Sequence, residues 1–148
     1  MKWNTSLFRP LSAANKKRKV QKQTSDEMAQ DSLRNQVEQA IKMLAAIVES
    51  SDDAIIGETP GGVITSWNAG AERLYGYSAA EVVGKSITIL ASPGQPSDME
   101  RVLNRVLIGE AVHHYETKRM RKDGRSIDVS LAVSAIKDAA GKIIGVST

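Results

Sequence analysis

Apolar positions between residues 24 and 50 recur at helical spacing and predict one amphipathic helix. The segment opens on Thr24 and Glu27, whose side chains can each accept a hydrogen bond from the other's backbone N–H at a helix start. The apolar positions follow at spacings of four, four, three and four: Leu33, Val37, Ile41, Leu44 and Val48. We expect this stripe to pack on its own domain or on the same helix of a second subunit, as a short coiled coil.

Residues 51–90 alternate between strand and short-helix patterns. The stretches "AIIGE" and "GVITSW" flank "TPGG", whose proline and glycines favour a turn, so a β-hairpin is expected. The next stretch, "WNAGAERLYGYSAAEVVGKSI", gives each of two short helices its own start and stop. Asn68 and the Ser78–Glu81 capping box are the starts, and Gly76 and Gly84 are the stops. The "SITIL" segment predicts one more apolar turn or a short strand.

The remainder of the chain predicts one longer helix and three strands. Apolar residues from Met99 to Leu107 repeat at helical spacing up to Gly109. Residues 112–120, 127–135 and 143–148 then read as strands, separated by the turns "RKDGR" and "DAAGK". Five strands in two groups with helices between them predict an α+β fold, an antiparallel sheet with short helices on one face. Short helices on a sheet can enclose a cavity.

Charge is distributed unevenly along the chain. Of the 20 Lys and Arg residues, seven lie in residues 1–22, which contain no Asp or Glu. We expect residues 1–23 to form a basic, disordered tail, residues 24–50 the amphipathic helix, and residues 51–148 the folded domain. The run "NKKRKV" is similar to a nuclear import signal or a nucleic-acid contact, but we favour a solubilising leader over nucleic-acid binding.

Composition excludes several kinds of chemistry. The chain has no cysteine, which excludes disulfides, thiolate metal sites and Cys nucleophiles. No apolar window reaches membrane-span length and the start lacks a secretory signal pattern, so we expect a cytoplasmic protein. There is no glycine-rich phosphate loop and no recognisable catalytic triad, and we therefore expect no enzymatic activity.

Two stretches carry a resemblance to the PAS family of sensory domains. They are "SSDDAIIGETPGGVITSWNAGAERLYGYSAAEVVGKSI" and "KRMRKDGRSIDVSLAVSAIKDAAGKIIGVST". The resemblance covers residues 33–148 and implies a five-stranded antiparallel sheet with helices on one face. It also implies a small-molecule pocket or an interaction surface, dimerisation through the helix before the sheet, and an output domain such as a histidine kinase.

Few residues of this sequence match those that the family uses to bind its known cofactors. The resemblance implies a cysteine near Asn68 for covalent flavin binding and a histidine on the longer helix for haem, and both are missing. A reversibly bound flavin would need amide partners, for which Asn104 and Gln95 are candidates. His113 and His114 are adjacent on a strand and are expected to point to opposite faces, where they cannot share one metal. We therefore expect no covalent flavin, no metal site and no haem.

We accordingly predict a non-catalytic sensory PAS domain of a two-component system. It would bind a small apolar ligand, form a homodimer through the stripe of residues 33–48, or both, and regulate an output domain after Thr148. The alternative is an interaction module with a filled core, followed by a haem or flavin sensor. The cavity-lining candidates, chosen by alternation and helical spacing, are Ile56, Ile64, Leu74, Ile89, Val102, Val106, Leu131 and Val133.

Overall fold

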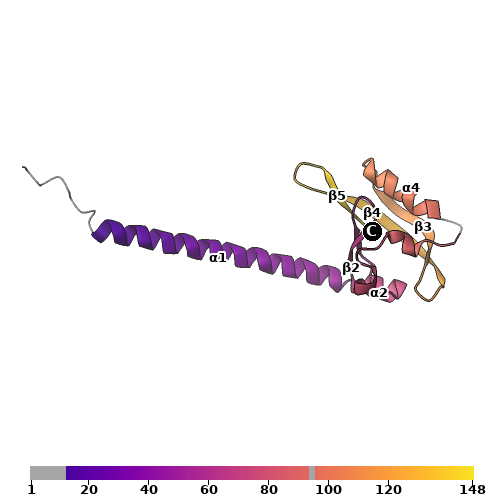
Figure 1. Cartoon of the computed structure of the whole chain (residues 1–148), viewed down its shortest axis with the longest axis horizontal. Coiled ribbons are helices and arrows are strands. Elements are labelled where there is room, and N and C mark those ends of the chain that lie inside the picture. The colour runs from indigo at the N-terminus through magenta and orange to yellow at the C-terminus, as the bar shows by residue number, and fades with distance from the viewer. Residues whose placement is uncertain (1–12, 94–95) are drawn as a thin grey trace, which may run out of the picture. The chain divides into compact units, whose positions relative to one another are not determined.

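The computed structural model describes residues 13–93 and 96–148, and its centre is one antiparallel sheet of five strands (Figure 1). The strands are β1 (Ile56–Glu58), β2 (Ile64–Trp67), β3 (Val112–Met120), β4 (Ser126–Lys137) and β5 (Ile143–Ser147). Their order across the sheet is β2-β1-β5-β4-β3. The central strand β5 pairs with both β1 and β4, and so joins the two hairpins into one sheet. This confirms the predicted five-stranded antiparallel fold.

Four helices follow β2 in the described part of the chain: α2 (Ala69–Tyr75), α3 (Ala79–Val82), the 3₁₀ helix η1 (Ile87–Leu90) and α4 (Pro96–Leu107). The first two begin at the capping residues that the sequence predicts. The Asn68 side chain accepts from the backbone N–H of Ala71 at 2.9 Å, and Gly76 ends α2 with a φ of +79°. Glu81 accepts from the backbone N–H of Ser78 at 2.8 Å in the predicted capping box. The "SITIL" segment forms a 3₁₀ turn and no strand.

The buried apolar side chains form two clusters on the helix-covered face of the sheet. The first joins the β1–β2 hairpin to α2, α3 and η1: Ile56, Ile64, Trp67, Ala71, Tyr75, Val82, Ile87 and Leu90. The second joins α4 to the other three strands: Val102, Val106, Val112, Val133 and Val146. The opposite side of β4 is exposed along alternate residues from Ser126 to Ile136. The core is therefore divided between the hairpin and α4.

The first helix, α1 (Ala13–Glu49), begins eleven residues before the predicted start at Thr24. Residues 13–22 are mainly Ala, Lys, Arg and Gln, which have high helix propensity, and no Gly or Pro interrupts them. Residues 13–23, which we expected to belong to a disordered tail, are thus part of α1, while residues 1–12 lie outside the described part. The stripe of residues 33–48 is 39–64% exposed. No described helix is long and apolar enough to cross a membrane.

A bulge in β3 contains its two histidines. The pairing of β3 with β4 shifts register between Val112 and Tyr115, and His114 has a φ of +51°. His113 and His114 are both exposed. The strict two-residue alternation on which the expectation for the two histidines is based is interrupted here, because a bulge sets more residues on one strand against fewer on its partner.

Asn68 connects α2 to two other segments through one buried side chain. Besides capping α2, its Oδ1 accepts from the backbone N–H of Ile55 at 2.8 Å. Its Nδ2 donates to the carbonyl oxygens of Val48 and Asp53 at 2.9 and 3.0 Å. The Asn68 side chain is buried, its hydrogen bond to Ala71 is buried and the other three are partly buried, so their loss leaves backbone groups without partners. Asn68 therefore fixes where the hairpin and α2 start.

Replacement of Asn68 by alanine should destabilise the domain by about 2–4 kcal/mol, because it removes a helix cap and leaves buried polar groups unpaired. Asn68→Ser is the matched control, since its hydroxyl oxygen can still cap α2 while the two hydrogen bonds donated by Nδ2 are lost, and its stability should fall between those of the alanine variant and the wild type. Urea denaturation measures the free energy of unfolding of both variants and of the wild type. A cost for Asn68→Ala below about 0.5 kcal/mol would contradict this role.

Candidate functional site

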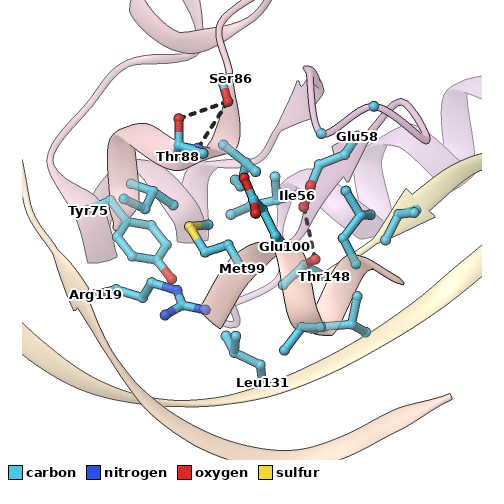
Figure 2. Close-up of a pocket in the computed structure, with 18 residues that line it drawn as sticks. Ile56, Glu58, Tyr75, Ser86, Thr88, Met99, Glu100, Arg119, Leu131 and Thr148 are labelled. Carbon is cyan, nitrogen blue, oxygen red and sulfur yellow. Dashed lines mark hydrogen bonds between the residues drawn. The ribbon is translucent and has the colours of Figure 1, made fainter. Parts of the chain in front are cut away.

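A cavity of about 190 Å³ lies where the two core clusters meet, between the sheet and α4 (Figure 2). Its lining comes from both clusters, with Ile56 and Leu90 from the first and Val102 and Val146 from the second. A cavity of about 150 Å³ lined by apolar side chains is enough to bind benzene. This space therefore suits a small molecule of one ring, and a haem or a flavin would require the surrounding elements to move apart.

The structure brings half of the predicted lining residues to this cavity. Those that line it are Ile56, Val102, Leu131 and Val133. The others lie within or against the packed clusters: Ile64, Leu74, Ile89 and Val106. Met99, the first apolar residue of the longer predicted helix, also lines the cavity. Helical and strand periodicity select the core-facing side, but they do not separate residues that touch the cavity from residues that are packed.

Polar groups lie at two places in the apolar wall. Glu58 on β1 is 6% exposed, and its Oε1 accepts a hydrogen bond from the Thr148 hydroxyl at 3.0 Å. Arg119 on β3 is 3% exposed, and Figure 2 shows its guanidinium on the side of the pocket where the Tyr75 hydroxyl lies. Since buried charged groups require partners, the partners of these two side chains determine the chemistry of the cavity.

Arg119 is paired with a carboxylate on α4. Its Nη1 donates to Asp98 Oδ2 at 3.1 Å and to Thr117 Oγ1 at 3.0 Å. Asp98 also accepts from the hydroxyls of Tyr115 and Thr117. Burial raises the pKa of Asp98, but these hydrogen bonds and the Arg119 charge outweigh burial, so the net pKa lies below its ordinary value. The hydrogen bond to Asp98 correspondingly raises the pKa of Tyr115.

Glu58 has no comparable cationic partner. Burial raises its pKa above the ordinary value, and the Thr148 hydrogen bond and the charge of Arg119 only partly offset this effect. Burial likewise raises the pKa of Tyr75. Within the described part of the chain, Glu58 Oε2 and Arg119 Nη2 have no hydrogen-bond partner. The cavity thus presents one acceptor and one set of donors that are not fully satisfied.

Sequence reasoning missed both charged residues. Glu58 stands two positions after Ile56, so strand alternation alone places it on the same inward face. Arg119 lies within the basic run "KRMRK", and such a run of like charge usually forms a solvated strand end. Arg119 is instead buried, and it pairs there with Asp98 on α4.

The side chains present do not fit a covalent flavin or a protein-held metal. The chain has no cysteine for a flavin adduct. Asn104 is exposed and does not line the cavity, and Gln95 lies outside the described residues. Among residues 13–93 and 96–148, no group of three or more His, Asp or Glu side chains is arranged to hold a metal ion.

Comparison with known proteins identifies the fold family. A family model described as the PAS fold matches residues 42–147, which include the whole sheet and all helices from α2 to α4. The chain belongs to the PAS family. The crystal structure of a PAS domain from Colwellia psychrerythraea has 26% sequence identity and a TM-score of 0.67, and the match covers 73% of this chain and 92% of that one.

Two further relatives extend the comparison. A PAS domain of an HTR-like protein from Haloarcula marismortui has a TM-score of 0.66 at 22% identity, covers 79% of this chain and 95% of that one, and shares the fold. Two-component system protein A of Emericella nidulans is 38% identical over 90 residues. That match covers 57% of this PAS chain but only 13% of the fungal protein's length. The family and this relative together support a role in signal sensing.

Glu58 and Asp98 should make opposite contributions to the pH dependence of stability. The pKa of Glu58 is raised above 4.5, so its contribution is fully present below that pH and is lost as pH rises through the folded-state pKa. Glu58→Gln should therefore gain stability relative to wild type as pH increases from acidic to neutral. Urea denaturation across this range measures the difference.

Asp98→Asn is the matched comparison. The pKa of Asp98 is lowered from 3.8, so its contribution is present above that pH and is lost as pH falls through the folded-state pKa. This variant should lose about 3–5 kcal/mol at neutral pH, because it leaves Arg119 buried without a counter-charge, and the loss should shrink in acid. If the stability of the two variants relative to wild type changed with pH in the same direction, the raised pKa of Glu58 and the lowered pKa of Asp98 would be contradicted.

Proposed function

We propose that this PAS domain is a non-catalytic input module that binds a small molecule in the cavity and transmits its occupancy to an output domain after Thr148. The cavity is the observation that carries the proposal, since an interaction module with a filled core would leave no such space. Apolar walls with a few polar groups are typical of small-molecule sites. The similarity to a two-component system protein supports an output in signal transduction, for which we propose a histidine kinase that acts in the cytoplasm.

Thr148 gives the cavity a direct connection to the end of β5. Its backbone N–H donates to Ile56 O at 2.9 Å, and its carbonyl oxygen accepts from Ile56 N at 2.8 Å. Its hydroxyl donates to Glu58 inside the cavity. A ligand that changes the hydrogen bonding of Glu58 therefore alters a contact of the residue that leads into the proposed output domain. Transmission requires the ligand to bind the two arrangements with different affinity.

We further propose that α1 forms a homodimer through its exposed stripe. Leu33, Val37, Ile41, Leu44 and Val48 share one side of the helix, since their spacings are three or four residues. Large exposed apolar side chains in a row on a soluble helix favour association. Because the stripe runs along a single helix, a second copy of the same helix supplies a matching apolar surface of equal length.

Native mass spectrometry of the purified chain tests both parts in one experiment. We expect a dimer that carries a mass excess, which disappears after organic extraction. Leu44→Glu should give a monomer that retains the excess, because it introduces a charge into the stripe. Gln39→Glu adds the same charge to the opposite side of α1 and should remain dimeric. Leu131→Trp should give a dimer without the excess, because the larger side chain occupies the cavity.

The outcomes separate the two proposals. A protein with no mass excess that also binds no added small apolar compound would refute the ligand site and favour the interaction module. A wild-type monomer, or equal dissociation of the Leu44→Glu and Gln39→Glu variants, would refute dimerisation through the stripe. Circular dichroism verifies that each variant is folded.

A further inference from the structure

The charges around the cavity are not balanced. Three described lining residues carry charge: Glu58, Glu100 and Arg119. Arg119 is already engaged by Asp98 in a buried ion pair of 3.1 Å, and that pair is close to neutral as a unit. Glu58 is buried on the cavity wall and receives one hydrogen bond, from the uncharged Thr148 hydroxyl. The uncompensated charge of the site is therefore negative.

A buried carboxylate without a cation is costly, and a bound cation relieves that cost. The Thr148 hydroxyl donates a hydrogen bond to Oε1 of Glu58, whereas no described residue donates one to Oε2. Tyr75 also lines the cavity, and an aromatic ring attracts cations electrostatically. The cavity therefore offers a cation a carboxylate oxygen, an aromatic ring and apolar walls.

A small anion finds less favourable surroundings. It would approach Arg119, whose Nη1 is held by Asp98, Thr117 and the carbonyl oxygen of Lys118. Free donors remain on this guanidinium, but any anion there would lie near the carboxylates of both Asp98 and Glu58. Arg119 is better suited to donate to a neutral acceptor or a water molecule than to neutralise a second anion.

We propose that the cavity binds a small organic monocation, with its nitrogen against the Glu58 carboxylate and its apolar body between the sheet and α4. This inference rests on the proposed function of the domain as a ligand sensor. The volume of about 190 Å³ limits the body to roughly one ring, and the walls from Ile56, Val102 and Val133 favour an aromatic or aliphatic group over a polar one. Protonated amines and protonated nitrogen heterocycles belong to this class.

The test is a calorimetric titration near neutral pH with three probes of similar size: benzylamine, benzyl alcohol and benzoate. Wild-type protein should bind benzylamine at least about tenfold more tightly than benzoate. Glu58→Gln should lower the affinity for benzylamine by about tenfold or more and change the affinity for benzyl alcohol little. The reason is that the amide keeps the shape of the side chain and the acceptor for the Thr148 hydroxyl but loses the negative charge. Glu116→Gln is the matched control at an exposed carboxylate that does not line the cavity, and it should have little effect on the binding of any probe.

Each other result has a distinct meaning. If benzyl alcohol binds and benzylamine is no tighter in wild type than in Glu58→Gln, the monocation inference fails while the ligand site stands. Preference for benzoate overturns the inference in the same way. If none of the three probes binds, or if Leu131→Trp binds all of them as wild type does, both the inference and the proposed ligand site fail.

Discussion

The buried ion pair between Arg119 on β3 and Asp98 on α4 is the interaction on which the cavity depends. Arg119 Nη1 lies 3.1 Å from Asp98 Oδ2, so the pair joins α4 to β3. The hydroxyls of Tyr115 and Thr117 also donate hydrogen bonds to the Asp98 carboxylate. A buried pair of this kind adds little net stability compared with apolar packing, but it is costly to break. Its main effect is therefore to fix where the first turn of α4 lies on the sheet.

The position of α4 explains why the core is not continuous. Val102 and Val106 pack on β4 and β5 further along the helix, while the β1–β2 hairpin forms its own cluster with α2, α3 and η1. The cavity occupies the boundary between these clusters, and charged residues lie on its wall because strands of both halves meet there. The same division gives a mechanism for sensing, since a ligand at the boundary contacts elements of both halves at once.

Local sequence signals predicted the regular elements well, because each is specified within a few residues. The caps at Asn68 and Ser78 and the Asp-Gly turn before β4 act on neighbouring backbone and need no tertiary information. The start of α1 at Ala13 was missed, since the capping pattern at Thr24 suggested a later start and the preceding positive charge suggested disorder. Continuous helix propensity outweighed both features.

The site itself was only partly predictable, because its features depend on contacts between distant residues. Alternation selected Ile56, Leu131 and Val133, and it also implied an inward Glu58. Nothing near Arg119 in the sequence indicates that it is buried, since Asp98 is 21 positions away. The bulge at His114 likewise arises from the pairing of β3 with β4 and has no local sequence signature.

The central claim is that Arg119 is neutralised by Asp98 while Glu58 remains without a cation. An NMR pH titration of the side-chain carboxyl carbons of the ligand-free domain tests it most directly. The account predicts that Glu58 titrates above its ordinary pKa of 4.5 and Asp98 below its ordinary pKa of 3.8. A pKa of Glu58 at or below 4.5, together with a raised pKa of Asp98, would show that Arg119 neutralises Glu58 and not Asp98, and would contradict the account.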